Sequence, residues 1–139
     1  MYKQRGFSLI EIMVVIVILG ILASLVVPKI MSRPDEARLV KVKQDILAIQ
    51  NALDLYKLDN GEYPTTEQGI AALVNKPTTE PIPSNWQQYL KSLPKDPWGR
   101  DYLYLYPGEH GEVDIFTLGP TNQPGGTGKN ATIGNWTIQ

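Results

Sequence analysis

The sequence has no cysteine and a single histidine, His110, in 139 residues. Without thiols the chain forms no disulfide, and it lacks the ligands of ordinary zinc sites and the pair needed for cysteine–histidine catalysis. No glycine-rich phosphate loop follows a predicted strand, so we expect this chain not to hydrolyse ATP itself. His110 lies at the predicted tip of a hairpin, where we expect a solvated imidazole and no general base. These absences argue against an enzyme.

Excess charge of either sign is also missing, since 13 basic and 14 acidic residues leave a formal net charge of −1. A surface that binds nucleic acid needs a clustered basic footprint, and the sequence contains none, so we expect no nucleic acid partner. The length leaves room for one modest domain beside a long helix. A small exported domain without disulfides must be stabilised by packing, by an ion or by neighbouring subunits.

What the sequence does contain is a long apolar run near its start. From Phe7 to Val27, 21 residues carry one charge, on Glu11. As a helix this run is roughly 31 Å long, about the thickness of a bilayer core, so we predict a transmembrane and assembly helix over residues 7–28. Two basic residues in the preceding hexapeptide are expected to hold the amino end in the cytoplasm.

The start of the chain does not fit an ordinary secretory signal. Glu11 interrupts the front of the apolar run, and the small-residue exit Ala23-Ser24 lies inside it. Cleavage after Gly6 instead keeps the whole helix and creates a new ammonium on Phe7. A carboxylate in lipid costs about 2.5 kcal/mol or more. We therefore predict that the ammonium of an incoming subunit neutralises Glu11 of its neighbour, so that assembly removes this penalty.

Beyond the apolar run, Pro28 is predicted to bend or melt the helix, which restarts in Ser32–Glu36, where a proline and acidic residues suit a first turn. The restarted helix, about residues 34–58, carries an apolar stripe with alternating spacings of three and four residues. The stripe consists of Leu39, Val42, Ile46, Ile49, Leu53 and Tyr56. It either covers a sheet or forms a coiled-coil seam between chains, and fewer than three full heptads favour the sheet.

Shorter elements are predicted after this helix. Thr65 and Gln68 have the spacing of a capping box and predict a second helix over about residues 66–75. Aromatic and β-branched residues then predict strands, separated by turn-forming residues. The expected elements are a β-hairpin over about 101–118, a glycine-rich loop over 119–132 and a last strand over 133–138.

The hairpin carries tyrosine on one face and leucine on the other. Tyr102, Tyr104 and Tyr106 alternate with Leu103 and Leu105. We expect the leucines to pack on the helix and the tyrosines to form a half-exposed face, with a sugar-binding strip as the less common alternative. The predicted fold class is α+β, with a long N-terminal helix packed on a small antiparallel β-sheet.

The segment Gly6-Phe7-Ser8-Leu9-Ile10-Glu11 resembles the leader motif of the type IV pilin and pseudopilin superfamily. The resemblance implies a type IV pilin-like fold, cleavage after Gly6 by a prepilin peptidase and N-methylation of Phe7. Further segments resemble the major pseudopilins of type II secretion systems, the general secretion pathway protein G family. They are Leu55–Asn60, Tyr63–Thr66 with Gln68-Gly69, Leu73-Val74, Leu93-Pro94 with Asp96–Gly99, Asp114–Phe116 with Leu118-Gly119, and Ile133–Trp136.

This family resemblance implies a leader over residues 1–6 and a periplasmic domain over 29–139, held in the bacterial inner membrane by one span. The implied function is that of the major structural subunit of a pseudopilus, which polymerises to drive folded proteins through the outer membrane. The implied partners are further copies of the chain, minor pseudopilins, the prepilin peptidase, an inner-membrane assembly platform with its cytoplasmic ATPase, and the outer-membrane secretin. As a secondary hypothesis, Lys91 of one subunit pairs with Asp54 on an adjacent helix.

The same resemblance implies a calcium ion in the loop before the last strand, bound by aspartates and backbone carbonyls. This sequence departs from that pattern, because it has no carboxylate side chain between Leu118 and Gln139. Only a carbonyl of Leu118 and the neutral oxygens of Thr121, Asn130 and Thr132 remain as weak candidate ligands. We therefore predict that the loop folds without a tightly held ion.

Two alternatives from other classes remain open. A type IV pilin would share the helix and the mode of assembly but would form a surface fibre for adhesion or motility. A membrane-tethered carbohydrate-binding protein would use the tyrosine strip of the hairpin and would not need Glu11.

Overall fold

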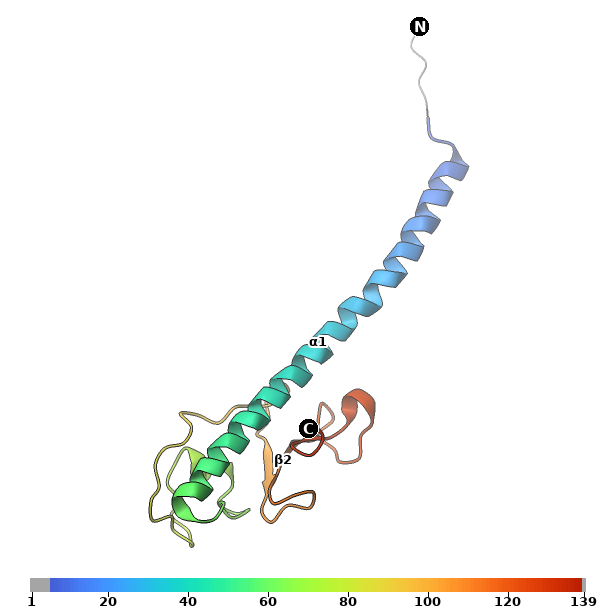
Figure 1. Cartoon of the computed structure of the whole chain (residues 1–139). Helices are drawn as coiled ribbons and strands as arrows, with labels where there is room; N and C mark the ends of the chain where they lie inside the picture. Colours follow the sequence, from blue (N-terminus) through green and yellow to red (C-terminus); the bar gives the residue numbers. More distant parts are fainter. Residues whose placement is uncertain (1–5, 139) are drawn as a thin grey trace. The chain divides into compact units, whose positions relative to one another are not determined.

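The computed structural model describes residues 6–138 of the chain, apart from the side chains of residues 25–32. One long helix, α1 (Leu9–Asn60), precedes all the other elements (Figure 1). These are the 3-10 helix η1 (Ile70–Leu73), strands β1 (Leu103–Leu105) and β2 (Asp114–Thr117), the 3-10 helix η2 (Gly128–Asn130), and strand β3 (Ile133–Gly134). The chain forms two compact units, Met1–Ala37 and Arg38–Gln139.

Helix α1 is assigned without interruption from Leu9 to Asn60. The predicted restart in Ser32–Glu36 is therefore wrong. An interior proline removes one backbone hydrogen bond and tends to kink a helix, but the bonds of the neighbouring turns suffice to continue it here. The predicted leader, residues 1–6, lies outside the described residues except for Gly6.

Within the part of the chain whose placement is described, no helix is both long enough and apolar enough to cross a membrane. The predicted span over residues 7–28 includes positions 25–28, whose side chains lie outside that description. The transmembrane assignment therefore stays a prediction.

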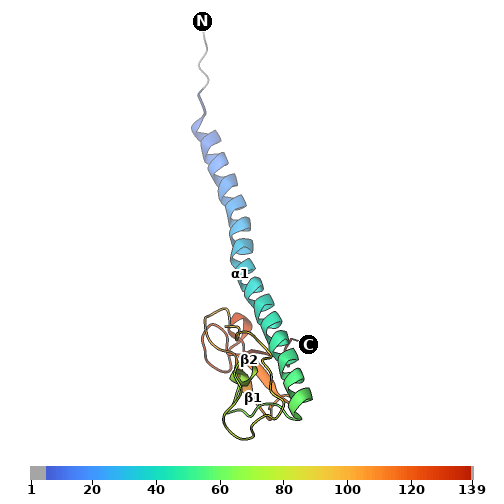
Figure 2. The same ribbon diagram turned by 90° about the vertical axis from the view of Figure 1, so that its left-hand side faces the viewer.

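The apolar stripe of α1 forms the inner face of the C-terminal unit. Val42, Ile46, Ile49 and Leu53 are fully buried, and Tyr56 nearly so. They share one hydrophobic core with side chains of η1 and the sheet, and β2 lies beside this half of the helix in both views (Figures 1 and 2). The interpretation of the stripe as the cover of a sheet is confirmed, with the exception of Leu39, which is 39% exposed.

The sheet has three strands in the order β1-β2-β3, and both pairings are antiparallel. In β1, Tyr104 pairs with Ile115 of β2. The predicted hairpin is confirmed. The predicted last strand is shorter than expected because the chain turns after Gly134, where the backbone N–H of Thr137 donates to the Gly134 carbonyl at 2.9 Å.

One asparagine after β3 joins the sheet to the helix. The Asn135 backbone N–H donates to the Ile115 carbonyl at 2.9 Å. Its side-chain amide donates to the carbonyl of Val113 at 2.8 Å and to Oε1 of Gln50 on α1 at 3.2 Å. The C-terminal tail, the central strand and the helix are thus connected through a single side chain.

The predicted orientation of the hairpin is wrong, because the tyrosines face the core and Leu103 is 40% exposed. Tyr102 and Tyr104 are 3% and 7% exposed. The Tyr102 hydroxyl donates to Oδ2 of Asp45 at 2.7 Å, and the Tyr104 hydroxyl donates to the Pro64 carbonyl at 2.7 Å. Because each hydroxyl finds an acceptor, the large rings are buried without an unsatisfied polar group. A sugar-binding tyrosine strip is not available on this face.

The predicted second helix is reduced to the four residues of η1. The capping box itself forms, since the Gln68 backbone N–H donates to Oγ1 of Thr65 at 3.1 Å and the Thr65 N–H donates to Oε1 of Gln68 at 3.0 Å. Gly69, however, has a φ of 63°. A left-handed residue cannot continue an α-helix, so the two reciprocal bonds close a turn and η1 begins after it.

The buried tyrosines predict a loss of stability in alkali. Burial raises the pKa of Tyr102 and Tyr104, and burial with a hydrogen bond to Asp54 raises the pKa of Tyr63 to about 12. Unfolded tyrosine ionises near pH 10, so above that value the folded state binds more protons than the unfolded state. This stabilisation is complete below about pH 10 and is lost as pH rises through the folded-state pKa values.

Urea unfolding at about pH 8 and about pH 11 should therefore give a lower free energy of unfolding at the higher pH, by about 1 kcal/mol for each such tyrosine. Tyr102→Phe should reduce this alkaline loss by about the same amount. An unfolding free energy equal at both pH values would contradict the prediction.

Candidate assembly surface and loop site

The amino end of α1 presents the predicted processing and assembly residues on an exposed surface. Phe7 is 79% exposed, and the Oγ of Ser8 accepts a hydrogen bond from the Glu11 backbone N–H at 3.2 Å. Ser8 thus caps the helix, with Glu11 in the first turn, where a carboxylate is favoured by the helix dipole. Every residue from Gly6 to Ser24 is exposed. The described part of the chain therefore leaves this apolar segment uncovered.

The outer face of α1 in the C-terminal unit also carries exposed apolar side chains. Leu47, Leu55 and Leu58 are 55%, 51% and 79% exposed, on the side of the helix away from the core. An apolar surface beside polar residues is typical of a protein–protein contact.

The predicted pair of Asp54 and Lys91 is not formed within the described part of the chain, where no ion pair joins the two residues. Asp54 Oδ1 accepts hydrogen bonds from the Tyr63 hydroxyl and the Gln50 side-chain amide, both at 2.9 Å. Lys91 is exposed. Both side chains are exposed, and the predicted contact between subunits stays a prediction.

The hairpin tip holds a cluster that the sequence analysis missed. The Asp114 carboxylate is buried and accepts hydrogen bonds from the backbone N–H groups of Glu109 and His110, and it lies 3.0 Å from Nδ1 of His110. The imidazole stacks on Trp136 with ring centroids 3.8 Å apart. The His110 side chain is 45% exposed, as expected for a solvated imidazole, but one face of its ring is covered by Trp136. Asp114, which follows a hairpin loop that contains Gly108 and Gly111, was the signal in the sequence for this cluster.

The surroundings of Asp114 show that this cluster fixes the hairpin. Burial alone would raise the pKa of the Asp114 carboxyl, but the hydrogen bonds from the His110 ring and from two backbone N–H groups lower this pKa below its usual value. A Cβ added to Gly108 would lie 2.6 Å from Oδ1 of Asp114, so only glycine fits there. The arrangement ties the loop to β2 and Trp136.

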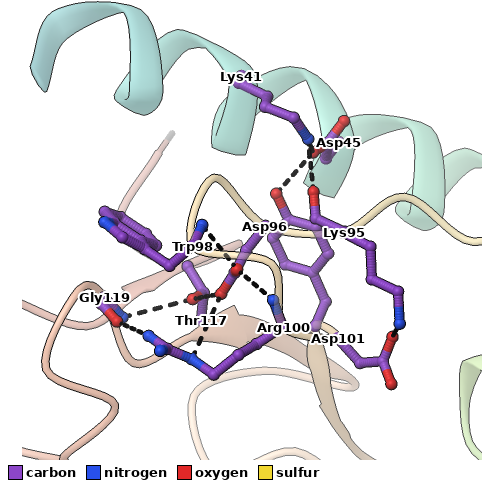
Figure 3. A network of polar contacts seen from close by, with 10 residues as sticks. Lys41, Asp45, Lys95, Asp96, Trp98, Arg100, Asp101, Thr117 and Gly119 are labelled. Carbon is purple, nitrogen blue, oxygen red and sulfur yellow. Dashed lines mark hydrogen bonds and ion pairs between the residues drawn. The ribbon is translucent and has the colours of Figure 1, made fainter. Parts of the chain in front are cut away.

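A second unpredicted network surrounds Asp96, which is 4% exposed (Figure 3). Its Oδ1 accepts hydrogen bonds from the backbone N–H groups of Trp98 at 3.0 Å and Arg100 at 2.8 Å, which closes a turn that begins at Asp96. Its Oδ2 accepts the Thr117 hydroxyl at 2.7 Å. The Arg100 guanidinium reaches past it to donate to the Gly119 carbonyl.

The candidate calcium ligands do not form a charged site. Thr121 is exposed, and Leu118, Asn130 and Thr132 are half-buried. Among the described residues, no group of three or more acidic or histidine side chains is arranged to hold a metal ion. Calcium requires six to eight oxygen ligands, with carboxylates supplying most of the affinity. The residues present therefore do not fit a tightly bound calcium ion.

Comparisons with known proteins identify the chain's relatives. Residues 29–136 match the family described as type II secretion system (T2SS), protein G, and residues 1–27 match the prokaryotic N-terminal methylation motif. Type II secretion system core protein G of Vibrio cholerae is 58% identical, with 100% of this chain and 96% of the relative covered. The protein of that name from Pseudomonas aeruginosa is 59% identical, with 96% of each chain covered.

A solved structure supports the same relationship. The major pseudopilin from the type 2 secretion system of enterohaemorrhagic Escherichia coli is 49% identical and superposes with a TM-score of 0.72, covering 81% of this chain and 98% of that chain. The predicted pilin-like α+β fold is thereby confirmed. The chain belongs to the type II secretion system protein G family.

Proposed function

We propose that this chain is the major structural subunit of a type II secretion pseudopilus. The observation that carries the proposal is the exposed apolar end of α1, with Glu11 in its first turn directly behind the methylation motif. A soluble domain on its own has no use for such a segment, because exposed apolar area of this extent favours association with lipid or with other chains. In a family of secretion pseudopilins, association of this kind corresponds to assembly of a pseudopilus.

The proposed assembly step is electrostatic. Cleavage after Gly6 by a prepilin peptidase leaves the amine of Phe7, which the same enzyme methylates and which remains a cation. In the membrane, this cation on an incoming subunit neutralises Glu11 of its neighbour, and the axial register of the fibre follows from that pairing. The cap from Ser8 uses the Oγ, so the Glu11 carboxylate is not needed to begin the helix.

Small residues in the same segment allow helices to approach closely in lipid. Gly20 is one of them, and a Cβ added there would meet no atom of the chain within 4 Å. The Ser24 hydroxyl donates to the Ile21 carbonyl at 2.7 Å, so this polar group is satisfied within its own helix. Neither residue requires water at a helix–helix contact.

In the proposed location, residues 7–28 cross the inner membrane once and the domain over residues 29–139 lies in the periplasm. An assembly platform and its cytoplasmic ATPase would add subunits at the base, and minor pseudopilins would complete the fibre. Growth of the fibre below an outer-membrane secretin would push folded proteins outward. The exposed leucines on the outer face of α1 would be covered by neighbouring subunits.

Replacement of the Glu11 carboxylate gives the most direct test. Glu11→Leu should leave the protein in the membrane but reduce fibre formation and secretion about tenfold or more, because the pairing that offsets about 2.5 kcal/mol is lost. Secreted substrate in the medium and sheared fibres can be measured by immunoblot. Glu36→Gln, another exposed acid of α1, is the control and should secrete normally. Full secretion by Glu11→Leu would favour a tethered binding protein.

Processing can be tested on the fibre itself. The intact mass of the purified subunits should correspond to Phe7–Gln139 with one added methyl group, because the motif precedes the apolar helix in the required position. Mass spectrometry of the N-terminal peptide places the methyl group. Subunits that retain residues 1–6 in working fibres would refute the proposed pairing of amine and carboxylate.

The second contact is tested by charge reversal. Asp54→Lys or Lys91→Glu alone should reduce fibre formation severalfold, and the double variant should restore much of it if the two charges meet between subunits. Glu62→Lys, an exposed acid just beyond α1, is the control for a change of net charge. A double variant as defective as the single variants would exclude the pair. Surface fibres at native expression without a secretion defect on deletion would instead favour a type IV pilin.

A further inference from the structure

The Arg100 guanidinium has no role in the proposed assembly, yet it takes part in the polar network around Asp96 (Figure 3). Its Nη2 donates to the carbonyl of Gly119, and its Nε lies 4.0 Å from Oδ2 of Asp96. The arginine side chain is 32% exposed, and the Asp96 side chain is 1% exposed. A positive charge therefore lies at the first residue of the loop over 119–132.

The base of this side chain is held rigidly. The Arg100 backbone N–H donates to Oδ1 of Asp96 at 2.8 Å, and Gly99 has a φ of +80°, which the turn requires. Thr117 completes the circuit, since its hydroxyl donates to Oδ2 of Asp96 and its Oγ1 accepts the Gly119 N–H at 3.3 Å. The N–H group of Gly119, through Thr117, and its carbonyl, through Arg100, are thus both linked to the Asp96 turn.

The Gly119 carbonyl controls the closure of the loop. Its oxygen also accepts the Asn122 backbone N–H at 3.2 Å. Gly119 has a φ of +79°, and a Cβ added there would lie 3.1 Å from the Ala131 carbonyl oxygen and 3.3 Å from that of Asn130. The first and last residues of the loop therefore lie against each other, and a group that fixes Gly119 fixes both ends.

The side-chain charges around this loop are positive, as they would be if a cation already occupied it. From Leu118 to Gln139 the sequence has no carboxylate side chain and one charged side chain, the positive Lys129. Asp96, the buried carboxylate of the network, accepts two backbone N–H groups and one hydroxyl and faces the guanidinium. A divalent cation at the Gly119 carbonyl would meet neutral oxygens and the Arg100 guanidinium, which disfavours its binding.

We propose that the Arg100 guanidinium is the built-in cation of this loop, replacing the calcium ion that the family resemblance implies. It links the Asp96 turn to the Gly119 carbonyl, and the loop folds identically with or without Ca²⁺. A planar guanidinium suits this position because one N–H group donates to the Gly119 carbonyl while the spread positive charge faces the Asp96 carboxylate, an arrangement that suits a lysine ammonium less well.

The test uses the full chain in detergent micelles, with either about 1 mM CaCl₂ or excess EGTA, and inorganic Ca²⁺ as the probe. Thermal unfolding followed by tryptophan fluorescence should give the same Tm for the wild type in both buffers. Calorimetric titration with Ca²⁺ should show no site tighter than about 1 mM. A rise in Tm with Ca²⁺, or a micromolar site, would overturn the proposal.

Arg100→Gln should lower the Tm by about 5 °C in both buffers, because a charge-assisted hydrogen bond at the loop closure is lost. Lys95→Gln is the matched control, since its side chain is 59% exposed and forms only a surface ion pair with Asp101, and its Tm should change little. Arg100→Lys should lie between Arg100→Gln and the wild type.

A second measurement reports on the loop alone and remains informative if a variant is poorly stable. Endoproteinase Lys-C cleaves after the exposed Lys129, and release of the peptide over residues 130–139 can be followed by mass spectrometry. The wild-type rate should be independent of Ca²⁺, and Arg100→Gln should be cleaved severalfold faster. Equal rates for the wild type and Arg100→Gln would show that the arginine does not secure the loop.

Discussion

The structure of the C-terminal unit depends on burial of one helix face against a very small sheet. Val42, Ile46, Ile49 and Leu53 meet strands of three, four and two residues. So few ladder hydrogen bonds cannot hold an isolated sheet together, because short strands need a helix against one face to be stable. The tyrosines of the hairpin solve this by filling the space beneath the helix while their hydroxyls reach Asp45 and the Pro64 carbonyl.

Two buried carboxylates add hydrogen bonds that the small sheet does not supply. Asp96 organises the turn before β1, and Asp114 organises the turn before β2, each through backbone N–H groups. Both residues are almost fully covered. In a chain without disulfides, hydrogen bonds to buried charged groups are among the strongest local constraints available, since each contributes about 1.5–3 kcal/mol. The fold is stabilised from its loops as much as from its core.

The sequence predicted those features that follow from periodicity and local spacing. The stripe from Val42 to Tyr56, the hairpin and the reciprocal bonds of Thr65 and Gln68 belong to this class. Its errors arose where long-range packing decides. Alternation in β1 fixes which residues share a face, but not which face is buried, and the acceptors for the tyrosine hydroxyls come from segments about 40 and 57 residues away. Gly69 shortened the predicted second helix through its positive φ, whereas Pro28 and Pro34 did not interrupt α1.

The same limit applies to the candidate site. The motif around Phe7 and Glu11 is contiguous, so the family resemblance can be seen in the sequence alone, and the match to the N-terminal methylation motif includes it. The contact between Arg100 and Gly119 joins residues 19 positions apart, and the stacking of His110 on Trp136 joins hairpin and tail. Neither has a local signature. The absence of carboxylates after Leu118 pointed to a departure from the family pattern, but not to the arginine that accompanies it.

The position of Asn135 has a mechanical consequence. Its amide spans from the central strand to Gln50, so the tail is attached to the helix as well as to the sheet. In a filament that advances by adding subunits at its base, thrust enters each protomer through the helix and must reach the surface that faces cargo. The asparagine offers a short route for that load from the helix to the central strand, and shear would strain these hydrogen bonds before it strained the apolar core.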